Sequence, residues 1–210
     1  MKFGVDEAGK GPVLGSMFAA AVRAPLEALP DGIDDSKRLT DATREDLADR
    51  LRADDRVAVG LAEITPTRID DGNMNDLTVA AHAEALSAVV EVGDAGLCDA
   101  GDVDADRFAA RVAERVDADV NVAAEHGADG ADELVGAASI VAKSARERHV
   151  VALSEEFGDV GSGYPSDPTT REFLRDHVER TGELPDCART SWSTCDDVLA
   201  AAEQSALGDF

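Results

Sequence analysis

The chain has 210 residues, of which 44% are hydrophobic, enough to bury the core of one large domain, so intrinsic disorder is not the default expectation. Its formal net charge is −24, and the 44 acidic residues are spread along the chain rather than gathered in a tail. This balance argues against an open basic surface for nucleic acid. We interpret the acidic excess as adaptation to a cytoplasm of molar salt, where the Debye length is only about 3 Å.

The three cysteines are odd in number and lack CxxC spacing, which is typical of a reducing cytosol rather than of a disulfide framework. The N-terminal residues lack the charged and apolar regions of a signal peptide. No apolar run approaches the ~18 residues that a membrane span needs. We therefore expect a cytoplasmic protein that does not enter a membrane.

Apolar periodicity predicts five strands and six helices in chain order. The expected strands occupy 2–7, a part of 11–24, 56–64, 95–100 and 119–126. The expected helices occupy 41–53 (capped by Thr40), 76 to about 92, 104–116, about 132–157, 168–181 and 192–204. This order predicts an α/β fold with a mixed five-stranded sheet flanked by helices and a helical C-terminal part. We expect one catalytic domain over 1–203 and a C-terminal tail over 204–210.

Acidic side chains stand where two predicted strands end. Asp6 and Glu7 end the first strand, and Asp99 ends the fourth. Ligands bind at the carboxyl ends of strands in open α/β sheets. A solvated acidic pair would be ordinary in so acidic a chain, but Asp6 follows an apolar strand and precedes a glycine turn. Because a buried carboxylate is costly unless it is paired or bound to metal, we favour a divalent-metal site.

The segment GVDEAGKG matches the phosphate-binding pattern GxxxxGK through Gly4, Gly9 and Lys10. That pattern requires Ser or Thr next, to reach magnesium, and this chain has Gly11. A nucleotide-hydrolysing P-loop enzyme is therefore the weaker alternative. We expect instead that the glycines allow backbone N–H groups to approach a sugar-phosphate closely.

A second alternative is a non-catalytic acidic metal-binding protein. Asp102, Asp104 and Asp106 alternate as in a calcium loop. The sixth position is Arg107 instead of Gly, and the twelfth is Ala113 instead of Glu. The pattern is more typical of acids at the start of a helix.

Two further segments carry candidate residues. Asp129 and Asp132 lie near the start of the long predicted helix, and Lys143 and Arg146 follow at helical spacing, a pattern that an ordinary amphipathic helix also shows. Tyr164, the only tyrosine, lies between glycine and proline. Such a residue either fills a packing gap or stacks on a sugar or base.

These motifs together resemble the archaeal form of ribonuclease HII, the type 2 ribonuclease H. GVDEAGKGP, DSKRLT, CDAGDVDADRF, HGADGADELVGAASIVAK and GSGYPSDPTTREFL follow in the family's order, from Lys2 to about Trp192. The resemblance implies a ribonuclease H-like fold in a protein of a halophile. It also implies cleavage of the RNA strand of RNA–DNA hybrids, and cutting 5′ of ribonucleotides embedded in duplex DNA, with 5′-phosphate and 3′-hydroxyl ends.

The resemblance also implies roles for individual residues. The catalytic, metal-binding acids would be Asp6, Glu7, Asp99 and Asp129, with Asp132 as the competing choice for the last. They would hold two Mg²⁺ or Mn²⁺ ions that support in-line attack of water. The residues that recognise the ribose 2′-hydroxyl at the RNA–DNA junction would be Gly9, Lys10, Gly11 and Tyr164. The residues that contact the nucleic-acid backbone would be Ser36, Lys37, Asn75, Lys143 and Arg146.

One residue departs from the family pattern. The glycine loop usually has Arg at its centre, and this chain has Lys10. Lysine, unlike arginine, gives no bidentate contacts. Specificity for the RNA–DNA junction is therefore kept if the glycine N–H groups recognise the substrate, and is in doubt if the family's arginine side chain does.

The last residues resemble the clamp-binding tails of archaeal replication proteins. Gln204, Leu207 and Phe210 have the spacing of a sliding-clamp-binding peptide, although the second aromatic is missing. A frayed terminus is the alternative. We expect the protein to be a monomer.

Overall fold

The computed structural model describes residues 1–33 and 39–208, with side chains up to Gln204. It divides into two compact units. The first unit contains Met1–Ala8, Met17–Ile64 and Asn73–Glu147. The second unit contains Gly9–Ser16, Thr65–Gly72 and Arg148–Phe210. The single catalytic domain over 1–203 stays a prediction.

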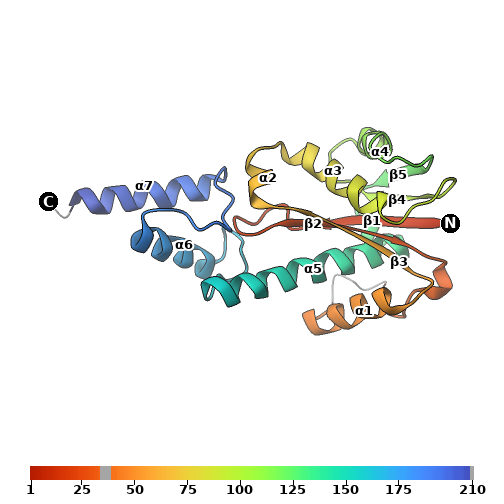
Figure 1. The fold of residues 1–210 in the computed structure, drawn as a ribbon, viewed down its shortest axis with the longest axis horizontal. Helices are drawn as coiled ribbons and strands as arrows, with labels where there is room; N and C mark the ends of the chain where they lie inside the picture. Colours follow the sequence, from red (N-terminus) through yellow and green to blue (C-terminus); the bar gives the residue numbers. More distant parts are fainter. Residues whose placement is uncertain (34–38, 209–210) are drawn as a thin grey trace. The chain divides into compact units, whose positions relative to one another are not determined.

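The first unit is built on one mixed five-stranded sheet, as predicted, with the strand order β3-β2-β1-β4-β5 (Figure 1). Its strands are β1 (Lys2–Ala8), β2 (Met17–Arg23), β3 (Ala58–Ile64), β4 (Ala95–Asp99) and β5 (Asn121–Glu125). β1 pairs antiparallel with β2 and parallel with β4. The central strand therefore ends at the same edge of the sheet as β4.

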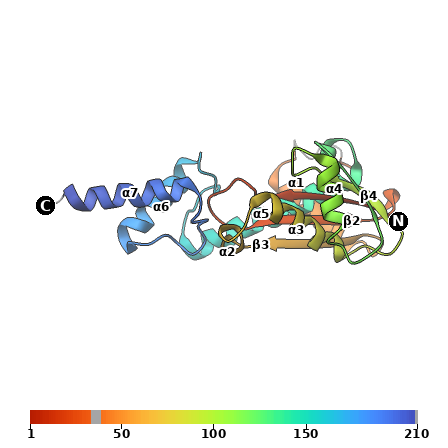
Figure 2. The same ribbon diagram turned by 90° about the horizontal axis from the view of Figure 1, so that it is seen from above.

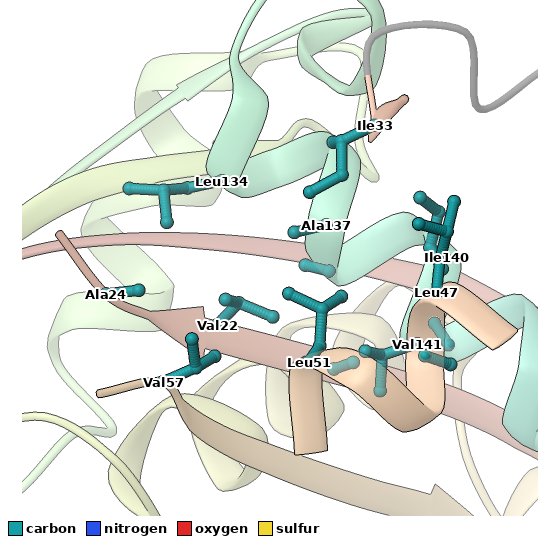
Figure 3. Packing of buried hydrophobic residues seen from close by; sticks show 14 of the residues in the cluster. Val22, Ala24, Ile33, Leu47, Leu51, Val57, Leu134, Ala137, Ile140 and Val141 are labelled. Carbon is teal, nitrogen blue, oxygen red and sulfur yellow. The ribbon is translucent and has the colours of Figure 1, made fainter. Parts of the chain in front are cut away.

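Helices cover both faces of this sheet. α1 (Asp41–Ala53) and the first part of α5 (Glu133–Phe157) lie on one face, and α3 (Met74–Ser87) and α4 (Ala105–Ala113) lie on the other (Figures 1 and 2). The core between the sheet, α1 and α5 is shown in Figure 3, where these side chains meet: Val22, Leu47, Leu51, Leu134, Ala137, Ile140 and Val141.

The start of α5 approaches β1 at a glycine. A Cβ added to Gly4 would lie 2.2 Å from the carbonyl carbon of Leu134 and 2.2 Å from the backbone nitrogen of Val135. Only glycine admits such a close approach of two backbones. Gly4 thus sets the distance between the central strand and the first turn of α5.

The second unit contains α2 (Pro66–Asp70), α6 (Pro168–Thr181) and α7 (Ser193–Gly208). Its core combines Val13 and Leu14 of the glycine segment with apolar residues of the C-terminal helices, such as Leu174 and Val198. Within residues 1–33 and 39–208, no helix has the length and apolar character needed to cross a bilayer.

Most predicted elements are confirmed, including the cap of α1, where the Thr40 side chain accepts a hydrogen bond from the Thr43 N–H. Three details differ. α3 ends at Ser87 rather than near 92, because the β-branched pair Val89–Val90 and then Gly93 disfavour helix. The five-residue helix α2 was not predicted, and α7 extends to Gly208.

Gly4→Ala tests the close approach of α5. The added methyl group meets backbone atoms that cannot rotate away, so we expect the free energy of unfolding to fall by about 3 kcal/mol. Urea unfolding in molar KCl measures this loss. Gly93→Ala is the matched control, because nothing lies within 4 Å of its added Cβ and only its φ of +89° is unfavourable. A loss of about 1 kcal/mol is expected there, and equal losses in the two variants would contradict the clash.

Candidate active site

Two of the three predicted strand-end acids, Asp6 and Asp99, lie at one edge of the sheet. β1 and β4 are parallel with Val5 opposite Cys98, so the next residues, Asp6 and Asp99, lie at the same level. Asp6 is 5% exposed. Successive side chains of a strand point to opposite faces, so Asp6 and the following Glu7 leave β1 on different sides.

A backbone hydrogen bond connects the end of β4 to the third acidic segment. The Ala128 N–H donates to Oδ1 of Asp99 at 2.7 Å. Ala128 begins a short 3-10 helix, Ala128–Gly130, that carries Asp129. Asp129 is 9% exposed, and Nζ of Lys143 lies 3.8 Å from its Oδ2.

Asp132, the competing choice for the fourth acid, has a structural task. Its Oδ1 accepts hydrogen bonds from the N–H groups of Leu134 at 2.9 Å and Val135 at 3.0 Å, at the start of α5. This is the arrangement of a helix N-cap. Asp129 and Asp132 both line a hollow of about 200 Å³. Unlike Asp129, Asp132 accepts hydrogen bonds from the first backbone N–H groups of α5.

The electrostatics of the acids indicate a shared, crowded environment. Burial, and then the charge of Glu7 and of Asp99, raise the pKa of Asp6 to about 7. Burial also raises the pKa of Asp99, with the charges of Glu7 and Asp129 acting in the same direction. The four carboxylates therefore repel one another, and a cation among them would relieve that repulsion.

A histidine that the sequence analysis missed contacts Glu7. His82 of α3 is fully buried, and its Nε2 lies 2.7 Å from Oε2 of Glu7. Burial lowers the pKa of His82, but contacts with Cys98 and Glu7 raise it, to a net value of about 10. The imidazole is therefore protonated at neutral pH and holds the Glu7 carboxylate. A polar residue among the buried positions Val79, His82 and Leu86 was the available signal.

The donor chemistry of this edge suits a hard divalent cation. All four acids offer carboxylate oxygens, which Mg²⁺ and Mn²⁺ prefer. Among the described residues, no three His, Cys, Asp or Glu side chains form an arrangement that could hold a metal ion. Coordination would therefore require the carboxylates to turn toward a shared point.

The predicted recognition residues lie in the second unit. Gly9 has φ +91°, in the region that favours glycine. A Cβ added to Gly11 would lie 3.5 Å from Cε1 of Tyr164, which is 39% exposed. The structure thus brings the glycine loop and the only tyrosine together. A fully buried arginine of the same unit, Arg189, contacts this loop, and the sequence analysis did not single it out.

The remaining candidates are dispersed. Asn75 is exposed near the start of α3, and Lys143 and Arg146 are half-buried on α5. Gln204 is exposed on α7, which also includes the backbone of Leu207. Three predicted residues lie outside the described residues: Ser36, Lys37 and Phe210.

The structure disfavours both alternatives from the sequence. The glycine loop leads into strand β2, whereas a P-loop leads into a helix. In the calcium-like segment, Asp104 caps α4 by accepting from the Arg107 N–H, and Asp102 pairs with the Arg107 side chain. Both acids therefore interact with the first turn of α4.

Asp6→Asn tests the crowding of the acids. A carboxyl whose pKa is raised in the folded state binds more protons there than in the unfolded chain, so its contribution to stability falls as pH rises from about 4 to about 7. Removing the charge should stabilise the metal-free protein by on the order of 2–4 kcal/mol at pH 7, and by little near pH 4. Thermal unfolding in chelator and molar KCl measures the difference.

Asp94→Asn is the control, for which we expect the opposite change in stability at pH 7. Burial raises the pKa of Asp94, but hydrogen bonds from the N-terminal amine, Glu91 and Arg23 lower it to about 2. Its contribution to stability is present above pH 4 and is lost as the pH falls toward 2. This variant should therefore be less stable than the native chain at pH 7. A destabilised Asp6→Asn protein at pH 7 would contradict the crowding.

Comparison with known proteins identifies the family of this chain. A family model described as ribonuclease HII matches residues 3–195. Ribonuclease HII of Natronomonas pharaonis is 70% identical over 207 residues, which cover 99% of this chain and 98% of that protein.

Two solved structures are also similar. The ribonuclease H2 from Pyrococcus horikoshii OT3 has a TM-score of 0.89 at 35% identity, and the match covers 97% of this chain and 99% of that one. The ribonuclease HII in a complex with PCNA from Archaeoglobus fulgidus has a TM-score of 0.82 at 36% identity, covering 94% and 96%. The resemblance and the ribonuclease H-like fold predicted from the sequence are confirmed. The chain therefore belongs to the ribonuclease HII family of hydrolytic endonucleases.

Proposed function

We propose that this protein cuts the RNA strand of RNA–DNA hybrids and also cuts 5′ of single ribonucleotides embedded in duplex DNA, leaving 5′-phosphate and 3′-hydroxyl ends. Family membership supports the first, coarser activity. The observation that supports the chemistry is that four acids, of which Asp6 and Asp129 are buried, lie near one sheet edge, where the pKa of Asp6 is raised to about 7. Such perturbed carboxyls are typical of functional sites.

The proposed catalytic acids and metal ligands are Asp6, Glu7, Asp99 and Asp129. Two Mg²⁺ or Mn²⁺ ions, when bound, would neutralise these acids, activate water and stabilise the leaving oxygen. Asp129 is preferred to Asp132 as the fourth acid, because Asp132 caps α5.

The protein's own residues prepare this site in three ways. The His82 imidazolium holds the Glu7 carboxylate at 2.7 Å. The Ala128 N–H orients Asp99. Lys143 lies near Asp129, where it offers a positive charge. The Ala128 contact favours the charged form of Asp99, which burial and the neighbouring carboxylates disfavour.

The proposed recognition element is the loop Gly9–Gly11 with Tyr164. The 2′-hydroxyl is the group that separates RNA from DNA, and reading it requires a close backbone and a hydrogen-bonding partner. Glycine permits the close approach, and the exposed ring beside Gly11 offers both a stacking face and a hydroxyl. Ser36, Lys37, Asn75, Lys143 and Arg146 stay candidates for backbone contacts.

Cleavage of a defined duplex tests this function. The native protein, in Mg²⁺ and molar KCl, should cut both a continuous hybrid and a DNA duplex carrying one ribonucleotide, with product ends identified on sequencing gels. Asp129→Asn should lower kcat/KM by more than about a hundredfold. Asp132→Asn is the matched control, because Asn caps helices as well as Asp, and its activity should stay within about threefold.

If Asp132→Asn loses more kcat/KM than Asp129→Asn, the fourth acid is Asp132. No cleavage of either substrate by the native protein, at any salt concentration with either metal, would overturn the proposed function.

We also propose that Gln204, Leu207 and Phe210 bind a replication sliding clamp. The similar ribonuclease HII from Archaeoglobus fulgidus forms a complex with PCNA, which supports such a partner. The monomeric state and the cytoplasmic location stay predictions.

Removal of residues 204–210 tests the clamp proposal. The truncated chain should lose about tenfold or more in retention on an immobilised archaeal clamp, because the three anchoring side chains are gone, while its cleavage rate stays unchanged. Glu203→Ala, just outside the pattern, is the control and should be retained like the native chain. Equal retention of all three proteins would exclude the tail as the binding element.

A further inference from the structure

Arg189 is a fully buried arginine in the second unit, at 0% exposure. Its guanidinium stays charged at any physiological pH. Burying a charge is costly unless hydrogen bonds satisfy its donors. The position of those donors therefore indicates what the residue stabilises.

All three guanidinium nitrogens donate to carbonyls of the segment 9–15, which begins with the glycine loop. Nη2 donates to the Gly9 carbonyl at 2.6 Å, Nη1 to the Lys10 carbonyl at 2.8 Å, and Nε to the Gly15 carbonyl at 2.8 Å. The backbone N–H of Arg189 also donates to the Val13 carbonyl at 2.8 Å. One residue thus fixes both ends of the segment 9–15.

Arg189 is itself held in place. Its guanidinium carbon lies 5.2 Å from the ring centroid of Trp192, within the range of a cation–π contact. The next two residues, Thr190 and Ser191, each donate to Asp70 through both backbone N–H and hydroxyl, at 2.6–2.9 Å. Arg189 is therefore anchored by a ring contact of its own and by the hydrogen bonds of its two neighbours to Asp70.

Planar peptide geometry determines where the loop's N–H groups point. In a trans peptide, the carbonyl of one residue and the N–H of the next point in opposite directions. Because the carbonyls of Gly9 and Lys10 point at the buried guanidinium, the N–H groups of Lys10 and Gly11 point away from it. Gly11 is exposed and lies beside the ring of Tyr164.

We propose that Arg189 is the positioning residue for ribonucleotide recognition: it holds the glycine loop so that the Lys10 and Gly11 N–H groups donate to oxygens of the ribose-phosphate beside Tyr164. This inference rests on the proposed function and assigns its specificity to a residue outside the loop.

The proposal also accounts for Lys10, where the family usually has Arg. The loop conformation is set by carbonyl contacts with Arg189, and these do not involve the side chain of residue 10. Lysine at this position therefore keeps the N–H groups in place.

Arg189→Lys tests the proposal, because an ammonium cannot reproduce the planar fork of three nitrogens. The measured quantity is the ratio of kcat/KM for a DNA duplex with one ribonucleotide to kcat/KM for a continuous hybrid of the same sequence. We expect this ratio to fall by about tenfold or more, through KM for the single-ribonucleotide duplex, because charge-assisted hydrogen bonds that set the loop are lost. Mn²⁺ affinity, measured by calorimetry, should not change.

Leu174→Ala is the matched control. Leu174 is fully buried in the core of the same unit, so its truncation lowers stability without touching the guanidinium. Its substrate ratio should stay within about threefold of the native value. An equal loss of the ratio in both variants, or an unchanged ratio in Arg189→Lys, would overturn the inference. Failure of the native protein to cut either substrate would instead overturn the proposed function.

A second measurement uses the native protein and so does not depend on the folding of a variant. In amide NMR spectra recorded in chelator, the Lys10 and Gly11 signals should shift on addition of the single-ribonucleotide duplex and much less with the all-DNA duplex. Equal shifts with both duplexes, or none, would also overturn the inference.

Discussion

Bringing carboxylates of the same charge to one sheet edge raises the free energy of the folded chain, and much of the first unit compensates for that cost. The raised pKa of Asp6 reports the repulsion directly. A buried imidazolium, His82, holds Glu7, and a backbone N–H holds Asp99. Lys143 lies near Asp129. These contacts lower the repulsion without removing it, so a cation bound at this edge would relieve what remains.

In the second unit, the main feature is the conformation of the backbone segment 9–15. A buried guanidinium holds the segment 9–15 through hydrogen bonds to three of its carbonyls. Charge in the first unit and geometry in the second thus come from separate interactions. A change in one set of residues need not alter the other.

The sequence predicts the acids better than their supports, for a physical reason. Asp6 and Asp99 could be predicted because strand periodicity locates the ends of β1 and β4, and parallel strands end at one edge. His82 lies 75 residues from Glu7, and Arg189 lies 180 residues from Gly9. No local pattern reports contacts over such separations, and His82 offered only a polar position on an apolar helix face.

The contact between residues 9 and 189 also has a consequence for the order of folding. Strand β1 can pair with β2 once the first 23 residues have been made, because that hairpin is local. The loop between them is different, since its carbonyls await a partner that the ribosome adds almost at the end of the chain. During synthesis the sheet edge is therefore assembled first, and the loop acquires its final shape only when the C-terminal segment docks. The nascent chain therefore contains all four acids well before it contains the arginine that holds the loop.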